Sequence, residues 1–128
     1  MSRLKTAVDT VINVISARFS VKITPPPLPE KGGGIVVMND NAEIEWQSLN
    51  LKHARISVPM TMLIKHKTAA ETFETAAQIQ EYLTEPNFSD FKSDEVQICG
   101  FKITNGTALA EKDEDCIYQL QFAIKYAY

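Results

Sequence analysis

The sequence is short of several residue types on which particular functions depend. It has two cysteines, two histidines and a formal net charge of −3 over 128 residues. So few cysteines argue against a disulfide framework and favour synthesis in a reducing compartment. The acidic balance argues against non-specific binding to nucleic acid, which requires a basic surface that replaces counterions. It also provides no polybasic patch for an anionic membrane.

Long apolar runs are missing as well. The apolar residues near the N-terminus are interrupted by Asp9, Asn13 and Arg18, so we expect neither a signal peptide nor a spanning helix there. No other segment is long and apolar enough to cross a bilayer. The composition, 45% hydrophobic and 23% charged, is typical of a globular protein. Its length fits one domain, and we predict a single domain over residues 1–128.

Two segments have the apolar spacing of helices that lie against a sheet. Apolar side chains recur at intervals of three and four in residues 3–17. Residues 68–84 open with Thr68 and Glu71, at the spacing of a capping box. In this second helix we expect Phe73 to lie on the buried face with the alanines.

Alternating apolar and polar residues predict the strands. The predicted strands cover residues 35–38, 42–50, 53–66, 95–104 and 116–128, and residues 20–23 could form a further short strand. Since most are sequential neighbours joined by short turns, we predict an α+β fold. It has a mainly antiparallel sheet of about four to five strands, two helices packed on one face and a long Pro/Gly loop.

Four local features make this prediction more specific. Ile44 and Trp46 are expected on one face of their strand, with polar residues on the other. Pro59 interrupts the longest alternation, which indicates a sheet edge or a bulge. Asn105 and Gly106 form a turn signal. The last alternating segment reaches the final residue, which predicts an edge or terminus that something must cover.

The stretch TPPPLPEKGGGIVV, residues 24–37, combines a stiff proline segment with glycines that bend freely. It is not a phosphate-binding loop of the Walker type, because Lys31 precedes the glycines and a strand follows them. The PPLP segment remains an alternative as a docking peptide for a proline-reading domain. We predict an arm within the domain, loose in the free subunit and used in docking.

Candidates for chemistry are few. Cys99 and Cys116 could act as nucleophiles with His53 or His66 as base, but both cysteines are in phase with apolar neighbours and are expected to be buried. No CxxC or HxxxH spacing predicts a metal site. The carboxylate pairs fall on solvated faces or turns, where nothing raises a pKa for acid–base work. We therefore assign no catalytic residue, cofactor or metal.

Aromatic and loop residues are the remaining candidates. Trp46 and the C-terminal tyrosines either pack in the core or form an oligomer contact, where aromatic residues are enriched. The candidate oligomer or docking residues are Pro25, Pro26, Pro27, Lys31, Gly32, Gly33, Gly34, Trp46, Pro59, Glu111, Asp113, Glu114 and Asp115.

The order of these patterns resembles the tail-terminator (tail-completion, neck) family of long-tailed bacteriophages. The matching segments are the amphipathic LKTAVDTVINVISARF, the loop VKITPPPLPEKGGG, the apolar GIVVM, the strand and helix RISVPMTMLIKHKTAAETFETAAQIQEYL, and the closing YQLQFAIKY. They cover almost the whole chain as a pattern, without an invariant signature.

The resemblance implies a structural virion protein without catalytic residues or cofactors. Such proteins form rings, usually hexameric, at the head-proximal end of the tail tube. They stop tube polymerisation and form the interface to the head–tail connector. The implied partners are further copies of the chain, the tail tube protein and the connector protein. The chain would be assembled in the host cytoplasm and located in the virion. Two alternatives stay open: a small cytosolic α+β enzyme or ligand-binding domain, and an adaptor that docks through its proline-rich loop.

Overall fold

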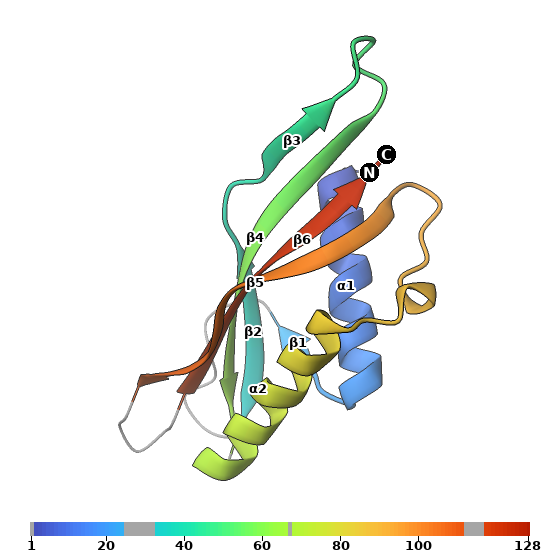
Figure 1. The fold of residues 1–128 in the computed structure, drawn as a ribbon. Helices are drawn as coiled ribbons and strands as arrows, with labels where there is room; N and C mark the ends of the chain where they lie inside the picture. Colours follow the sequence, from blue (N-terminus) through green and yellow to red (C-terminus); the bar gives the residue numbers. More distant parts are fainter. Residues whose placement is uncertain (1, 25–32, 67, 112–116) are drawn as a thin grey trace.

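The computed structural model describes residues 2–24, 33–66, 68–111 and 117–128 (Figure 1). Two helices and six strands confirm the α+β prediction, with more strands than the four to five expected. In chain order the elements are α1 (Arg3–Phe19), β1 (Ile23–Thr24), β2 (Gly34–Asn39), β3 (Glu43–Gln47), β4 (Ala54–Lys65), α2 (Ala69–Thr84), the 3-10 helix η1 (Phe88–Asp90), β5 (Gln97–Glu111) and β6 (Ile117–Ala127).

All strands belong to one sheet with the order β1-β2-β4-β6-β5. The long strand β4 is central, because β6 pairs with it along its whole length. On its other side, β2 pairs with the second half of β4, and β3 pairs with the first half. The pairing is antiparallel except between β1 and β2, which are parallel. The expectation of a largely antiparallel sheet is therefore confirmed.

Pro59 lies inside the sheet, so its prediction as an edge or bulge marker was wrong. No register shift occurs at Pro59, which pairs with Ala123 of β6. Its carbonyl accepts from the backbone N–H of Asp40 at 2.9 Å, on the side where β2 ends and β3 has not yet begun. A residue in a strand directs its nitrogen and its carbonyl to the same side. The N–H that proline lacks therefore falls at a gap in the ladder.

The C-terminal strand is also internal, which corrects the expectation that it leaves an edge. β6 lies between β4 and β5 and pairs with both. Its alternation is confirmed by the burial of Leu120, Phe122, Ile124 and Tyr126. The chain itself thus covers both sides of this strand.

The turn predicted at Asn105 and Gly106 was wrong, because β5 continues through it to Glu111. The extra residues are absorbed by shifts in register with β6 between Ile103 and Ala108. Gln80 of α2 supports the irregular backbone: its Oε1 accepts from both the N–H and the hydroxyl of Thr107, each at 2.7 Å. A helix distant in sequence therefore stabilises the bulged strand where the local signal indicates a turn.

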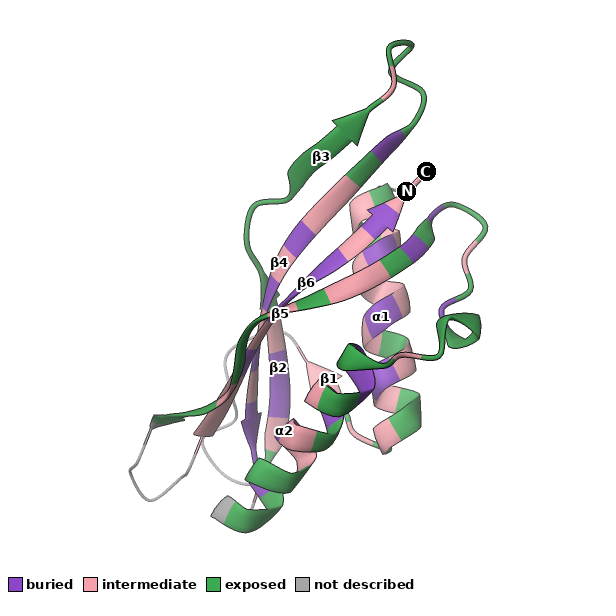
Figure 2. Ribbon diagram, viewed as in Figure 1, coloured by how far each residue is buried: buried purple, intermediate pink, exposed green. Residues whose placement is uncertain are grey.

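Both helices pack on the same side of the sheet, and their buried residues join the strands in one core (Figure 2). From α1 the fully buried residues are Ala7, Val11 and Ile15. From α2 the core includes Ile79 and Leu83. A single core of this kind confirms the prediction that two amphipathic helices cover one face.

The predicted cap of α2 is confirmed, and so is the burial of Ala76 and Leu83, whereas Thr72 takes the buried place predicted for Phe73. The hydroxyl of Thr68 accepts from the N–H of Glu71 at 3.1 Å, as in a capping box. Thr72 is fully buried, whereas Phe73 is about half exposed and meets the ring of Tyr118 edge-on, with centroids 5.5 Å apart. Thr72 can be buried because its hydroxyl donates to the carbonyl of Thr68 and accepts from the N–H of His66, both at 2.9 Å.

An aromatic cluster closes the core between α1, α2 and β5. Tyr82 meets Phe19 edge-on with centroids 5.9 Å apart and stacks on Phe91 at 6.0 Å. Its hydroxyl donates to the carboxylate of Asp90 at 2.9 Å, and the guanidinium of Arg18 lies 4.3 Å from its ring centroid. Burial, followed by the bond to Asp90 and its negative charge, raises the pKa of Tyr82 from 10.0 to about 12.

This shift predicts a specific loss of stability at high pH. Because the folded pKa of Tyr82 exceeds the unfolded value of 10.0, the folded state binds its proton more tightly. The stabilisation is complete below pH 10 and is lost as pH rises toward 12. Urea unfolding between pH 9 and 12 should show a free energy of unfolding that falls more steeply for the native protein than for Tyr82→Phe. Equal slopes would contradict the assignment.

Candidate assembly surface

A hairpin projects beyond the two helices and is the most exposed regular part of the chain (Figures 1 and 2). It consists of β3, the connecting loop and the first part of β4, and is called here the hairpin arm (residues 43–57). All five residues of β3 are exposed. Ile44 is 62% exposed and Trp46 57% exposed, while Leu49 and Leu51 in the loop are even more exposed. Apolar side chains concentrated on a projecting element indicate a contact surface.

A bulge separates Ile44 and Trp46, so their predicted common face was wrong. Ile44 pairs with Ile56, whereas Trp46 pairs with Arg55, and the register shifts between them. Paired residues in an antiparallel ladder point to the same face. Ile44 therefore shares the helix side with Ile56, which packs against the core. Trp46 lies on the opposite, open face with Arg55.

Hydrogen bonds within the loop hold the tip of the hairpin arm. The hydroxyl of Ser48 lies 2.6 Å from Asn50 Oδ1 and accepts from the N–H of His53 at 3.1 Å. Leu51 has a φ of 60°, and its N–H donates to the carbonyl of Ser48 at 3.0 Å. Leu49 and Leu51 are thus presented on an ordered loop. Sequence reasoning missed them as contact residues, although Leu49 interrupts the polar side of the alternation.

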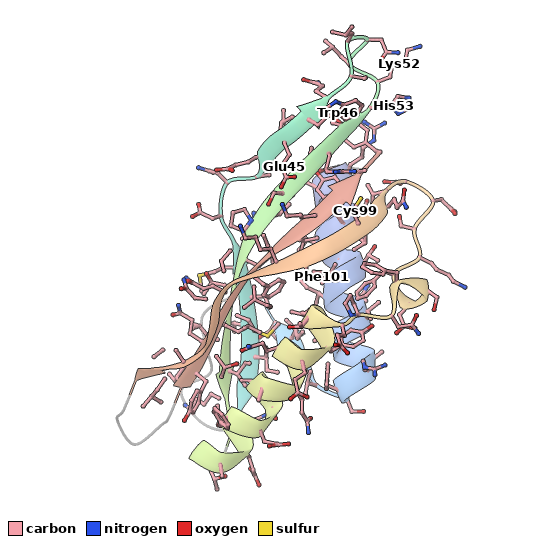
Figure 3. All side chains as sticks on the ribbon, in the orientation of Figure 1. Glu45, Trp46, Lys52, His53, Cys99 and Phe101 are labelled. Carbon is pink, nitrogen blue, oxygen red and sulfur yellow. The ribbon has the colours of Figure 1, made fainter. Side chains whose placement is uncertain are left out.

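The hairpin arm is tied to the neighbouring strand β6. Glu45 and Trp46 are neighbours on β3 (Figure 3). The carboxylate of Glu45 forms an ion pair with the ammonium of Lys125 on β6, beyond β4. Ala54 and Tyr128 exchange two backbone hydrogen bonds of 3.2 and 3.1 Å. These contacts fix the direction in which the arm projects. Trp46 is consequently presented on an anchored strand, which reduces the entropy lost on binding.

An open hollow of about 660 Å³ lies beside the base of the arm, between the start of α1, the end of β6 and the segment before β5. Arg3 places its guanidinium 4.0 Å from the ring centroid of Tyr128. Glu95 accepts from the hydroxyl of Thr6 at 2.9 Å. Burial, then the neighbouring Tyr128, raises the pKa of Tyr126 in its wall. The hollow is lined by neither Cys99 nor His66.

Of the described candidates, Cys99 lies apart from both histidines. Cys99 is exposed on β5, so its predicted burial was wrong: a register shift between Ile98 and Gly100 turns it out of the apolar phase. His53 and His66 flank opposite ends of β4, about 40 Å apart at the rise of a strand. Cys116 lies outside the described residues. Within the described ranges no three His, Cys, Asp or Glu residues gather as metal ligands, and no helix there is long and apolar enough to span a membrane.

Gly33, Gly34 and Glu111, which were also predicted as contact residues, lie at the end of the sheet opposite the arm. Gly34 pairs with Lys65, Lys65 with Ile117, and Ile117 with Glu111, so these residues form one row across β2, β4, β6 and β5. Gly33 adjoins this row, which is remote from Trp46. The predicted sites Pro25, Pro26, Pro27, Lys31, Gly32, Asp113, Glu114 and Asp115 lie outside the described residues.

Gly33 is packed so closely that a side chain would not fit. A Cβ added there would lie 2.9 Å from the carbonyl oxygen of Lys65 and 3.3 Å from the Cα of His66. We expect Gly33→Ala to lower the free energy of unfolding by about 1–3 kcal/mol, as overpacking does. The matched control is Gly100→Ala, where an added Cβ meets nothing within 4 Å. Urea unfolding of both variants measures the difference, and equal stabilities would contradict the close approach at Gly33.

Comparison with known proteins finds a similar fold but assigns no family. No protein-family model and no curated protein matches the sequence. A solved structure of the virion of a native gene transfer agent (GTA) particle contains a similar chain, with a TM-score of 0.58 and 14% sequence identity. The similarity covers 95% of this chain and 92% of that chain. The two chains therefore share one fold over nearly their whole lengths.

Proposed function

We propose that this chain is a structural virion protein, and more specifically that it caps the head-proximal end of a phage tail tube as a ring. The ring stops tube polymerisation and forms the interface to the head–tail connector. The observation that carries the proposal is the fold shared, end to end, with a chain of a gene transfer agent virion. The resemblance of the sequence pattern to tail terminators supports the finer assignment.

The surface supports assembly with like subunits. A closed ring requires two different, complementary patches on each subunit. The hairpin arm exposes apolar side chains on both of its faces, Ile44 on the helix side and Trp46 on the open face. We propose six copies in the ring, the tail tube protein and the connector protein as partners, and a location in the virion at the top of the tail. Residues 25–32 are proposed as a further docking segment, whereas Gly33 and Gly34 are already packed against or paired with β4.

The two alternatives have less support. An enzyme of the kind considered from the sequence needs a thiol beside an imidazole, and the described Cys99, His53 and His66 occupy separate places on the sheet. The adaptor alternative depends on prolines outside the described residues. It predicts that replacing Pro25, Pro26 and Pro27 with alanine abolishes one binary interaction and leaves self-assembly intact.

Purified protein mixed with tail tubes from its own virion tests the proposal. Negative-stain electron microscopy should show added density at one end of each tube, and native mass spectrometry of the bound material should give a ring of six copies. Binding along the tube wall, or a protein that remains monomeric at every concentration and on tubes, would refute it.

A further inference from the structure

The sheet has two free edges at the level of the hairpin arm, one on each side. Within the described residues, β3 pairs only with β4, and β5 pairs only with β6. β3 and β5 lie on opposite sides of the sheet (Figure 1). Each therefore presents unpaired backbone N–H and carbonyl groups, which another strand can bind.

The directions of these strands suit pairing between neighbouring copies. β3 is antiparallel to β4, β4 to β6, and β6 to β5. Three successive reversals make β3 and β5 run in opposite directions. If a second copy is placed beside the first without being turned over, its β3 lies antiparallel to the first copy's β5. The helices of both copies then remain on the same side of one continuous sheet.

The regular part of β5 has side chains that complement β3. Residues 100–103 pair with β6 without a shift, between irregularities on either side. Phe101 packs toward the core, so the adjacent Lys102 points to the open face. On β3, Glu43 pairs with Ser57 on the open face, and Ile44 lies on the helix side. Among the described residues, neither Glu43 nor Lys102 belongs to an ion pair.

The same charges disfavour pairing of identical edges. Two β3 strands related by a two-fold axis at Ile44 would place Glu43 opposite Glu45, and two β5 strands related at Lys102 would place the lysines opposite each other. Like charges directly opposite are destabilising, and opposite charges are stabilising. The irregularities that flank residues 100–103 also limit pairing elsewhere along β5.

We propose that β3 of one copy pairs antiparallel with β5 of the next copy, with Glu43 opposite Lys102 and Ile44 opposite Phe101. The sheet thereby continues from subunit to subunit. This inference rests on the self-assembly in the proposed function and identifies the two surfaces that produce it. The contact is head-to-tail, so it does not end at a dimer, and it closes into a ring when the rotation between neighbouring copies closes.

Disulfide trapping tests the pairing directly. Glu43→Cys and Lys102→Cys are made separately and together in a Cys99→Ser/Cys116→Ser background, and oxidised glutathione is added. The mixture of the two single variants should give a cross-linked dimer of unlike chains. The double variant should give a ladder of dimers, trimers and higher species on a non-reducing gel. Glu74→Cys, exposed on α2, replaces Glu43→Cys in the matched control and should give no cross-link.

Cross-linked dimers of either single variant alone would show pairing of identical edges and overturn the proposal. The proposal would also be overturned if the unmodified protein forms oligomers in native mass spectrometry but the cysteine variants give no cross-link between positions 43 and 102. That result would leave the proposed ring intact. If the double variant gives cross-linked oligomers but the protein does not bind tail tubes, the pairing of β3 with β5 is supported and the proposed function is refuted. The two ideas can therefore fail separately.

Exchange of the charges provides an independent test. Glu43→Lys and Lys102→Glu should each weaken self-association about tenfold or more, because each places like charges opposite one another. The double variant restores opposite charges and should recover to within about threefold of the native protein. Sedimentation equilibrium measures all four proteins. A double variant no better than the weaker single variant would contradict the pairing.

Discussion

Replacing Trp46 with serine is expected to weaken self-association about 30-fold or more while leaving thermal unfolding nearly unchanged. Trp46 is 57% exposed on a strand whose outer edge has no partner within the described chain. Loss of a tryptophan that becomes buried in an interface typically costs about 2 kcal/mol or more, which is about 30-fold in affinity. An exposed substitution changes folding stability by about 0.5 kcal/mol or less. Sedimentation equilibrium and a thermal melt of the same sample separate the two effects.

Phe88→Ser is the matched control for this prediction. Phe88 is another exposed aromatic residue, but it lies on η1, which belongs to neither free edge. We expect its substitution to leave self-association unchanged. If both variants weaken self-association equally, or if the Trp46→Ser protein assembles normally, the hairpin arm is not a contact surface between copies.

Replacing Phe122 with alanine is expected to lower the free energy of unfolding by about 3–5 kcal/mol. Phe122 is almost completely buried, and it pairs with Met60 of β4 and with Ile103 of β5. Its ring lies 6.5 Å from that of Phe101, so its loss opens a cavity beneath the edge strand. Because total stabilities are typically about 5–15 kcal/mol, much of the protein is expected to unfold at moderate temperature.

Urea unfolding measures this loss, and Phe88→Ala supplies a comparison at an exposed phenylalanine. A cost below about 1 kcal/mol for Phe122→Ala would mean that the site collapses around the missing ring. It would also contradict the description of β6 as an internal strand with one buried face.

Local periodicity was sufficient to predict the elements that bury one regular face. The helical spacing before Phe19 and the alternation from Ala54 to Lys65 both match the structure to within a few residues. Thr68 could be identified as a cap because a capping box satisfies backbone donors through residues three apart. In these segments the local pattern and the tertiary packing favour the same conformation.

The remaining features depend on contacts that no local pattern contains. A one-residue bulge moves Trp46 away from the face of Ile44, and another moves Cys99 out of the core. A proline in a strand is typical of a sheet edge, and only the gap between β2 and β3 explains how Pro59 fits inside the sheet. The candidate site was therefore predicted only at Trp46, and its exposed partners on the hairpin arm emerged from the sheet topology.

The central claim is that this chain ends the growth of a tail tube, and the length of assembled tails tests it most directly. Particles are produced with and without this chain, and their tails are measured by electron microscopy. The account predicts tails of uniform length joined to heads when the chain is present, and overlong tails without heads when it is absent. Tails of normal length joined to heads in its absence would contradict the account.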